Sequence, residues 1–510
     1  MDMDDDACYR VLLTRDSRFD GRLFVAVRTT GIYCRPICPA RTPKRENVTF
    51  YATATAAQVA GYRPCLRCRP ESSPDLGAWR GTSNTVSRAL GLIEAGALDD
   101  DDVEGLATRL GVGERQLRRL FHQHLGASPV SVAQTRRVLL AKQLIHETRL
   151  PMAEVALASG FGSVRRFNET FQALFDRPPA ALRRLSGAAS AGEDGVKLDL
   201  AYRGPYDWAG IVGFLSMRAI QGVEVVSAGA YARTIALGDD RGLLMVSPSA
   251  KPDRLSVTIH FPRLAALPSI IARVRRVFDL TADPAAIAEH LSGDPALAPR
   301  VAARPGLRVP GAWDGLELAV RAVLGQQITV AAATNLASRI VRDWGEPLPP
   351  ALAGMVPGLT HTFPSAERLA AADLSALPMP RSRSGYLHSL AEAVAADPAI
   401  FEPAGDLTTA IARLKSLPGI GEWTAHYIAM RQMREPDAFP TGDIGLMRAM
   451  AGVDGVRPTT RVLQHRAEAW RPWRAYAALH LWSGEVIPDP LAAAPILKDP
   501  SKDRHDRQAA

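Results

Sequence analysis

Cysteine is scarce in this chain of 510 residues. There are five cysteines, and none lies beyond Cys68. No run of about 18 apolar residues is present, so the sequence predicts no membrane-spanning helix. The start of the chain, residues 1–6, is acidic and lacks the apolar segment of a signal peptide. We therefore expect a cytoplasmic protein without a membrane partner, in which a cluster of cysteines favours a metal site over disulfides.

A net excess of positive charge is also lacking over most of the chain. Residues 105–186 carry 13 lysines and arginines against 5 aspartates and glutamates, whereas residues 1–104 sum to −1 and residues 187–510 to +1. Such a concentration is typical of a surface that binds phosphate, although a solvated basic face is the alternative. The length, with 47% hydrophobic residues, predicts three to four globular domains.

Four of the cysteines form two closely spaced pairs, Cys34-x3-Cys38 and Cys65-x2-Cys68. Each pair can place both sulfurs on one side of a turn, which suits one tetrahedral Zn²⁺ with four thiolate ligands. From the spacing alone, the simplest interpretation is a zinc site that only stabilises the fold.

The sequence around these pairs resembles the amino-terminal domain of the Ada family. The matching stretches are Val27-Arg-Thr-Thr-Gly-Ile-Tyr-Cys34-Arg-Pro-Ile-Cys38-Pro-Ala-Arg, Arg45-Glu-Asn-Val and Arg63-Pro-Cys65-Leu-Arg-Cys68. The resemblance implies that the zinc-bound thiolate of Cys34 accepts a methyl group from DNA methylphosphotriesters. Methylation would remove one negative charge and weaken the repulsion of DNA phosphates. The cations expected to bind the DNA backbone here are Arg28, Arg35, Arg45, Arg63, Arg67 and Arg69.

Between two polar joints, residues 70–83 and 186–196, the sequence predicts two helix-turn-helix units. Apolar residues recur at helical spacing, interrupted at Gly111-Val-Gly113 and at Gly160-Phe-Gly162, and a long helix around residues 129–146 joins the units. The second unit resembles the AraC-type DNA-binding domain, which implies recognition helices in successive major-groove segments, with a helical bundle bearing exposed arginines as the alternative. The candidate contact residues are Arg115, Gln116, Arg118 and Arg119, then Ser163, Arg165, Arg166 and Asn168.

The segment Leu417-Pro-Gly-Ile-Gly421 predicts a tight hairpin between two helices. Its bare backbone lets amides at the start of the next helix face a phosphate oxygen, but such a turn alone is a weak signal. The loop Phe439-Pro-Thr-Gly-Asp443 follows, and it resembles the glycine- and proline-rich loop that completes the motif of helix-hairpin-helix DNA glycosylases. Residues 197–486 as a whole resemble the AlkA-type 3-methyladenine glycosylases. Further matches are Tyr206-Asp-Trp, Arg304-Pro-Gly-Leu, Ala322-Val-Leu-Gly-Gln and Trp470-Arg-Pro-Trp.

This second resemblance implies the site residues. Breaking an N-glycosidic bond develops positive charge on the deoxyribose, which a fixed carboxylate at Asp443 would stabilise. An aspartate that merely caps the next helix is the alternative. A flipped base would enter a pocket whose aromatic faces attract cationic alkylated purines. The residues implied for the pocket are Phe214, Trp423, Tyr427 and Trp482, and those implied for DNA contact are Gly419, Gly421, Thr424 and Gln327.

Two further absences narrow the chemistry. Trp423 stands where glycosylases that also cut the DNA backbone carry a lysine, so we expect base release only. The second methyl-acceptor domain of Ada proteins, aimed at O6-methylguanine, needs a cysteine that this chain lacks after Cys68. Gln327 stands where a leucine wedge is expected, so Gln327 or Ile328 would fill the gap left by the flipped base. Ile444 and Gly445 also depart from the family, which leaves base preference open.

We therefore predict a multidomain, mainly α protein with α+β parts. We expect it to be a monomer that binds double-stranded DNA and, at target promoters, RNA polymerase. Strands are expected over residues 223–230 and 255–261, and a helix near residues 268–278.

One alternative is a methylation-sensing activator whose glycosylase half only binds DNA; another is an inert zinc domain beside an active glycosylase. The expected domains are 1–75 (zinc methyl acceptor), 83–186 (AraC-type helix-turn-helix), 187–196 (linker), 197–303 (α+β subdomain), 304–486 (helix-hairpin-helix glycosylase) and 487–510 (disordered tail).

Overall fold

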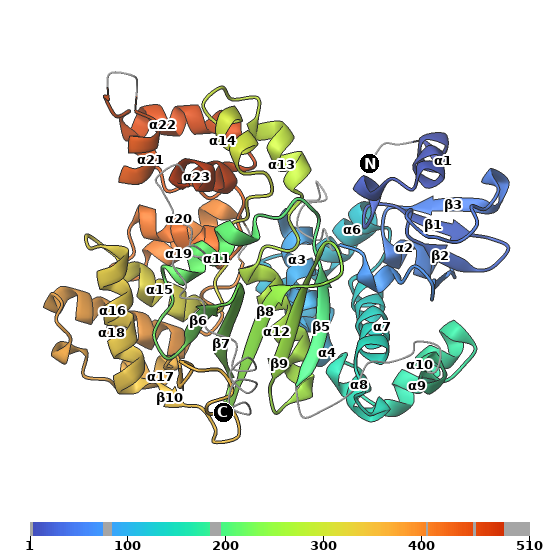
Figure 1. Cartoon of the computed structure of the whole chain (residues 1–510), viewed down its shortest axis with the longest axis horizontal. Coiled ribbons are helices and arrows are strands. Elements are labelled where there is room, and N and C mark those ends of the chain that lie inside the picture. Colours follow the sequence, from blue (N-terminus) through green and yellow to red (C-terminus); the bar gives the residue numbers. More distant parts are fainter. Residues whose placement is uncertain (1–3, 75–83, 184–194, 404–405, 452–454, 484–510) are drawn as a thin grey trace, which may run out of the picture.

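The computed structural model describes residues 4–74, 84–183, 195–403, 406–451 and 455–483. Figure 1 shows a small sheet domain at one end, a helical domain at the other and a larger sheet between them. The predicted fold class, multidomain and mainly helical with small sheets, is confirmed. The predicted tail and nearly all of the predicted linker lie outside the described residues. Among the described helices, none is long and apolar enough to cross a membrane.

The amino-terminal domain is a four-stranded sheet with the order β3-β1-β2-β4. Strand β2 pairs in parallel with the short strand β4, and Tyr33 lies opposite Pro64. Because Cys34 ends β2 and Cys65 follows β4 directly, this pairing brings the two cysteine pairs together. The elements are α1 (Asp5–Thr14), β1 (Phe24–Val27), β2 (Ile32–Cys34), β3 (Val48–Tyr51), α2 (Ala54–Val59) and β4 (Arg63–Pro64).

The next domain is helical and contains the two predicted helix-turn-helix units, α5–α6 and α8–α9, joined by the long helix α7. In both turns a glycine adopts a positive φ, +68° at Gly111 and +86° at Gly160, a conformation that few other residues tolerate. The elements are α3 (Asn84–Glu94), α4 (Ala97–Asp100), α5 (Val103–Arg109), α6 (Glu114–Leu125), α7 (Pro129–Glu147), α8 (Met152–Ala158), α9 (Val164–Phe175) and α10 (Pro179–Arg183).

An antiparallel five-stranded sheet with the order β5-β9-β8-β7-β6 follows. The strand expected over residues 223–230 is in fact two strands, because the chain turns at Ala228 and Gly229, which both have positive φ. The elements are β5 (Val196–Ala201), α11 (Trp208–Ser216), β6 (Glu224–Ser227), β7 (Ala230–Leu237), β8 (Asp240–Pro248), β9 (Arg254–His260) and α12 (Leu267–Val277).

The remaining domain is helical, and small buried residues such as Ala319, Ala425 and Ala477 let its helices pack closely. The predicted hairpin joins α19 to α20, and Asp443 immediately precedes α21. The elements are α13 (Pro284–Leu291), α14 (Ala298–Ala303), α15 (Gly315–Leu324), α16 (Val330–Trp344), β10 (Glu346–Pro347), β11 (His361–Thr362), α17 (Ala366–Ala370), α18 (Arg381–Ala396), α19 (Leu407–Lys415), α20 (Glu422–Arg431), α21 (Ile444–Ala449), α22 (Thr460–Ala467) and α23 (Arg474–Trp482).

The amino-terminal and carboxyl-terminal halves share one hydrophobic core. Phe167 and Phe171 of α9 belong to the same buried cluster as Leu198 of β5 and Ile270 of α12. At a second contact, Arg88 of α3 forms a buried ion pair with Glu435, which follows α20. The two halves are therefore packed against each other through buried contacts and are not joined by a linker alone.

Candidate functional sites

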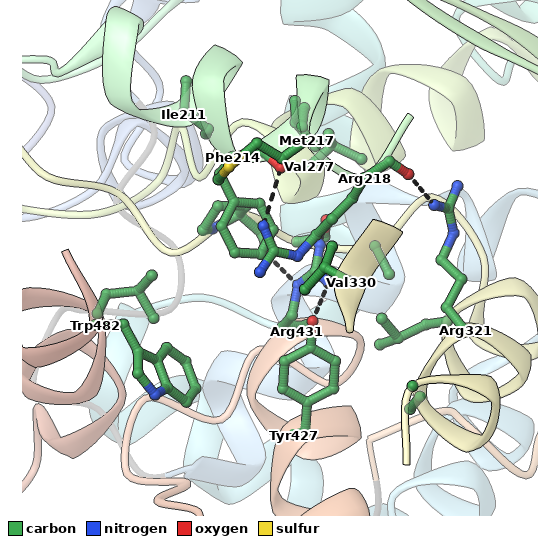
Figure 2. Close-up of a pocket in the computed structure, with 18 of the residues that line it drawn as sticks. Ile211, Phe214, Met217, Arg218, Val277, Arg321, Val330, Tyr427, Arg431 and Trp482 are labelled. Carbon is green, nitrogen blue, oxygen red and sulfur yellow. Dashed lines mark hydrogen bonds between the residues drawn. The ribbon is translucent and has the colours of Figure 1, made fainter. Parts of the chain in front are cut away.

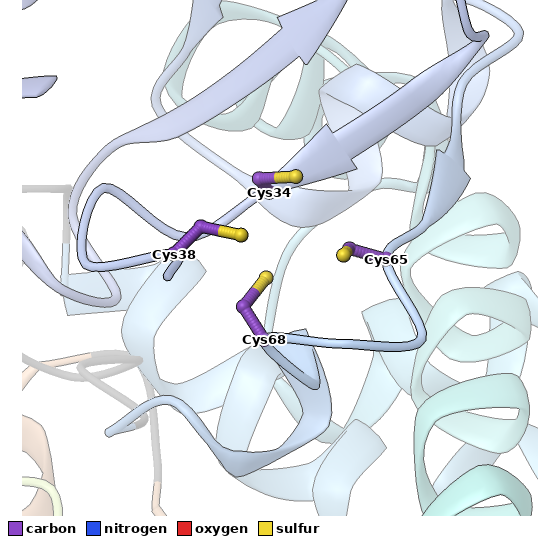
Figure 3. A group of neighbouring side chains, drawn as sticks. All are labelled: Cys34, Cys38, Cys65 and Cys68. Atoms are coloured by element: carbon purple, nitrogen blue, oxygen red, sulfur yellow. The ribbon is translucent and has the colours of Figure 1, made fainter. Parts of the chain in front are cut away.

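The four predicted cysteine ligands converge on one point (Figure 3). Their sulfur atoms all lie within 4.8 Å of one another, a spacing that fits a tetrahedral zinc ion with Zn–S bonds of about 2.3 Å. Cys38, Cys65 and Cys68 are buried, whereas Cys34 is partly exposed. The backbone amides of Arg35 and Arg67 donate to the sulfurs of Cys68 and Cys65, at 3.4 and 3.3 Å. Amide donors stabilise thiolates, so the donor set suits Zn²⁺.

Not every arginine predicted to bind DNA near this cluster is free to do so. Arg35 is buried, its Nε donates to Asp20 Oδ1 at 2.8 Å and its Nη1 donates to Ser72 Oγ at 2.9 Å. The Arg35 guanidinium therefore bonds within the fold and holds the loop under the cysteines, and its contact with a DNA phosphate stays a prediction. Arg45 is half-buried between Asp5 and Asp6, at 3.2 Å from each.

The other arginines near the cluster differ in exposure. Arg28 and Arg67 are exposed, and Arg63 is half-buried. Arg69 is half-buried and pairs with Glu71 and Glu147. Arg28, Arg63 and Arg67 stay candidates for contact with the DNA backbone.

Both recognition helices present their predicted contact residues to solvent. Arg118 and Arg119 of α6, and Arg165 and Arg166 of α9, are exposed on the side opposite the buried residues of each helix. Arg118 pairs with Glu114, and Arg165 with Glu169 at 2.8 Å, each one turn away. Exposed pairs of this kind are weak, so both arginines can exchange their carboxylate partner for a phosphate. Arg115, Gln116 and Asn168 are also exposed, whereas the Ser163 side chain caps α9 by accepting from the amide of Arg166.

The hairpin between α19 and α20 needs glycine for a steric reason. Gly419 has a φ of +80°, and a Cβ atom there would lie 2.5 Å from the ring of Tyr386. Gly421 is the N-cap residue of α20 and has no side chain to bond the first amides of the helix, so these amides stay candidates for binding a phosphate. Thr424 was expected to contact DNA, but its side chain is buried and its hydroxyl accepts from Gln326 Nε2 at 3.3 Å. The contact of Thr424 with DNA therefore stays a prediction, and the buried side chain does not favour it.

The loop between α15 and α16 lies beside this hairpin. Gln326 Nε2 donates to the carbonyl of Gly419 at 2.9 Å, and the carbonyl of Gln326 accepts from Arg383 at 2.6 Å. These bonds hold the next residue, Gln327, at the exposed tip of the loop with a φ of +62°, which is unusual for a residue other than glycine. Ile328 is also exposed, so both wedge candidates stand at the surface.

The four aromatic residues predicted for the base pocket line one cavity of about 550 Å³. Figure 2 shows Phe214 of α11, Tyr427 of α20 and Trp482 at the end of α23. Trp423 also comes from α20. Asp443 lies in the same cavity wall. The volume is in the range of small-molecule sites, so the cavity is large enough for a flipped base.

Asp443 is held by three N–H donors. Trp423 Nε1 donates to Oδ2 at 2.9 Å, Trp482 Nε1 donates to Oδ1 at 2.8 Å, and the backbone amide of Leu446 donates to Oδ1 at 2.8 Å. The last bond caps α21, so the cap and the fixed carboxylate occur together rather than as alternatives. The two indoles fix both carboxylate oxygens within the cavity.

Two arginines that the sequence patterns did not indicate also line this cavity. The guanidinium of Arg218 lies 3.8 Å from the ring centroid of Phe214, and that of Arg431 lies 4.8 Å from Phe214 and 5.2 Å from Tyr427. Trp423 stacks on Tyr427 at 5.0 Å. Cations therefore already contact the rings of Phe214 and Tyr427. That these two rings also meet a cationic base stays a prediction. The spacing in the sequence could have indicated these contacts. Each arginine follows its aromatic residue by four positions, on a helix or just after one, and residues four apart on a helix are neighbours.

These arginines also change the chemistry of Tyr427. Arg431 Nη1 donates to the Tyr427 hydroxyl at 2.7 Å. Burial raises the pKa of Tyr427, but the charges of Arg431 and Arg218 outweigh burial and leave that pKa below its usual value of 10.0. Beneath them, Arg321 donates to the carbonyl of Arg218 at 2.5 Å.

Four family models match the chain, in the order in which the parts were predicted. They are the metal binding domain of Ada over residues 7–71, a helix-turn-helix domain over 106–185, the AlkA N-terminal domain over 197–314 and the HhH-GPD superfamily of base excision DNA repair proteins over 320–475. The first match, together with the cysteine cluster, confirms the predicted Zn²⁺ site.

One relative is similar along nearly the whole chain. A probable bifunctional transcriptional activator/DNA repair enzyme AlkA of Mycobacterium tuberculosis is 42% identical over 484 residues, which are 94% of this chain and 96% of the relative. DNA-3-methyladenine glycosylase 2 of Escherichia coli is 38% identical over 56% of this chain and 96% of its own length. The bifunctional transcriptional activator/DNA repair enzyme Ada of Escherichia coli is 41% identical over 24% of this chain and 34% of its own length.

Proposed function

The chain belongs to the family of bifunctional transcriptional activators and DNA repair enzymes of the AlkA type, and we propose that it hydrolyses the N-glycosidic bond of 3-methyladenine-type bases while Cys34 accepts methyl groups from DNA phosphotriesters. The observation that carries the glycosylase activity is Asp443, whose two oxygens are fixed by Trp423 and Trp482 in the wall of a base-sized cavity.

Base release would proceed at this cavity in three steps. The amides after Gly421 bind a phosphate, and Gln327 or Ile328 fills the space left by the flipped base. As the bond to the base breaks, the carboxylate of Asp443 stabilises the positive charge that develops on the deoxyribose and orients the attacking water. Because Trp423 replaces the lysine that would form a Schiff base, the product is an abasic site in an uncut strand.

A base-release assay on methylated duplex DNA tests this activity. Wild-type protein should release alkylated base and leave abasic sites, and Asp443→Asn should lose at least about 100-fold in rate. No covalent adduct should form when borohydride is added, since no Schiff base is made. Base release by Asp443→Asn at the wild-type rate would sink the proposed role of Asp443.

Methyl transfer is proposed at the only partly exposed cysteine of the cluster. Cys34, Cys38, Cys65 and Cys68 would hold Zn²⁺, which would keep their sulfurs deprotonated. The Cys34 sulfur attacks the methyl carbon, the carbon–oxygen bond breaks, and the electron pair returns to the phosphate as a repaired diester. The cluster loses one negative charge, which weakens its repulsion of DNA and so favours promoter binding by α6 and α9.

The partners follow from these surfaces. Double-stranded DNA is the partner of both halves, and we propose that RNA polymerase is the partner at target promoters. We further propose that the protein acts as a monomer in the cytoplasm. Mass spectrometry after exposure to methylated DNA tests the transfer step: one methyl group on Cys34 is expected, and a methyl-free Cys34 would contradict it.

A further inference from the structure

Two arginines of the carboxyl-terminal, glycosylase half bond to the amino-terminal domain. Arg203 follows β5, and its guanidinium donates to the backbone carbonyls of Arg18 and Asp20. Arg254 begins β9, and its Nη2 donates to the backbone carbonyl of Ser72 at 3.2 Å. Arg203, Asp20 and Ser72 are buried. Because hydrogen bonds from a charged donor are stronger than neutral ones, these contacts hold two separate turns of the amino-terminal domain against the five-stranded sheet.

Asp20 and Ser72 are also the two residues whose side chains hold Arg35. Arg35 Nε donates to Asp20 Oδ1 at 2.8 Å, and Nη1 donates to Ser72 Oγ at 2.9 Å. Nη1 also donates to the carbonyl of Cys68 at 3.3 Å, and the backbone amide of Arg35 donates to the sulfur of Cys68 at 3.4 Å. Since Arg35 directly follows Cys34, it ties the proposed methyl acceptor to the second cysteine pair.

A further ion pair supports the same docking, and the two cysteine pairs are anchored by different domains. Arg22 pairs with the buried Asp283, which precedes α13 and also lies 4.0 Å from Arg203. The second cysteine pair is held by α7, because Lys142 donates to the carbonyl of Cys65 at 2.8 Å. The loop of the first pair is held from the glycosylase half.

We propose that Arg203 and Arg254 are positioning residues for methyl transfer. From the glycosylase half they fix both side-chain partners of Arg35, and through Arg35 they fix the loop that begins at Cys34. The inference rests on the proposed methyl-acceptor function and gives the carboxyl-terminal half a part in it.

Methyl transfer depends strongly on where the sulfur lies. The sulfur–carbon bond forms while the carbon–oxygen bond breaks, and the electron pair leaves with the phosphate oxygen, so the sulfur must lie in line with the departing oxygen. A displacement of about 1 Å caused by a distant substitution can slow a reaction about 100-fold. Strand β2 ends at Cys34, and the chain turns back at once, with the amide of Cys38 bonded to the carbonyl of Arg35 at 3.1 Å. The bonds of Arg35 therefore restrain a turn that no strand continues.

Single-turnover methyl transfer in the full-length, zinc-loaded protein tests the assignment, with a duplex that carries one methylphosphotriester. Arg254→Ala removes one contact, and Arg203→Lys keeps the charge but loses the planar fork that reaches two carbonyls. Each variant should lower the maximal rate of Cys34 methylation by about 10- to 100-fold and leave the DNA concentration at half-maximal rate unchanged. Release of 3-methyladenine should stay at the wild-type rate, which reports the folding of the glycosylase half.

The matched control is Arg241→Ala. Arg241 bonds to the carbonyl of Gly238 and to Glu346, both within the glycosylase half, so its loss should change neither rate. Hydrogen exchange supplies a readout that does not depend on activity. The amide of Arg35 should exchange faster in Arg254→Ala and Arg203→Lys than in wild type or Arg241→Ala, at unchanged zinc content.

The outcomes separate this role from the proposed function. Wild-type transfer and exchange rates in both variants would overturn the role of the two arginines while leaving the methyl acceptor intact. A change confined to the half-maximal DNA concentration would overturn it too, since the arginines would then act on DNA binding. Loss of zinc or of base release together with methyl transfer would show that they only stabilise the fold. Wild-type protein that gains no methyl group would overturn the proposed methyl-acceptor function itself and this role with it.

Discussion

The indole N–H of Trp482 donates to Oδ1 of Asp443 over 2.8 Å, linking the last residue of α23 to the residue before α21. Because Trp423 donates to the other oxygen at 2.9 Å, neither carboxylate oxygen is free to rotate away from the cavity. A catalytic carboxylate gains from such fixing, since no reorganisation is needed when charge develops on the sugar.

Trp482→Phe should slow base release while sparing methyl transfer. The substitution keeps an aromatic ring in the cavity wall but removes the N–H that holds Oδ1. We expect kcat for 3-methyladenine release to fall by about 10- to 100-fold, with a smaller change in KM. Methyl uptake by Cys34 in the same preparation is the control for folding. An unchanged kcat would show that the indole does not position Asp443.

Gly419→Ala and Gly421→Ala should separate stability from DNA affinity. At Gly419 a Cβ would meet Tyr386 at 2.5 Å, at a φ of +80°, so the variant should lose about 1–3 kcal/mol in the free energy of unfolding. At Gly421 a Cβ would meet nothing within 4 Å, so stability should hold. The added methyl group there would still crowd the phosphate and weaken binding to undamaged duplex. Urea unfolding and fluorescence anisotropy measure the two effects, and equal stability of the two variants would contradict the account.

Breaking the contact between the two halves should lower the free energy of unfolding. Arg88 and Glu435 are both buried, so Arg88→Ala leaves an unpaired buried carboxylate and should cost about 3–5 kcal/mol. Arg109 and Glu402 form a matched but half-exposed pair across the same contact, so Arg109→Ala should cost about 0–1 kcal/mol. Denaturant titration measures both. Equal losses in the free energy of unfolding for the two substitutions would show that the buried ion pair contributes no more to stability than the half-exposed one.

Removal of the metal should abolish methyl uptake by Cys34 and leave base release unchanged. Lys142 of α7 is fully buried and donates to the carbonyl of Cys65 at 2.8 Å and to Glu71 at 2.7 Å, so part of the ligand loop is anchored without the ion. Cys65→Ser should therefore lose zinc and methyl uptake but retain base release. Elemental analysis and the two assays check this. Loss of base release in the zinc-free variant would show that the cluster supports the glycosylase fold.

Most of the candidate site could be predicted because its motifs are local. The cysteine spacing gave the metal ligands, and Phe439-Pro-Thr-Gly-Asp443 located the carboxylate. The surroundings of these residues depend on contacts that are distant in sequence. Arg35 has the sequence pattern of a surface cation, but it forms a buried ion pair with Asp20. The hydroxyl of Thr424 accepts a hydrogen bond from Gln326, almost 100 residues earlier.

The packing of the two halves could not be predicted for the same reason. Phe167 and Phe171 recur at helical spacing, which identifies a buried helix face but not the cluster that this face shares with Leu198 of β5 and Ile270 of α12. Likewise, Arg218 and Arg431 come from separate domains, and only the fold brings both to Phe214.

We propose that one chain carries two independent repair reactions, at Asp443 and at Cys34. The most direct measurement incubates wild type, Asp443→Asn and Cys34→Ala with methylated duplex DNA, and scores released base and protein methylation in each sample. Asp443→Asn should lose base release and still gain one methyl group, and Cys34→Ala should show the reverse. If either variant lost both reactions, or neither, the assignment of two separate sites would be contradicted.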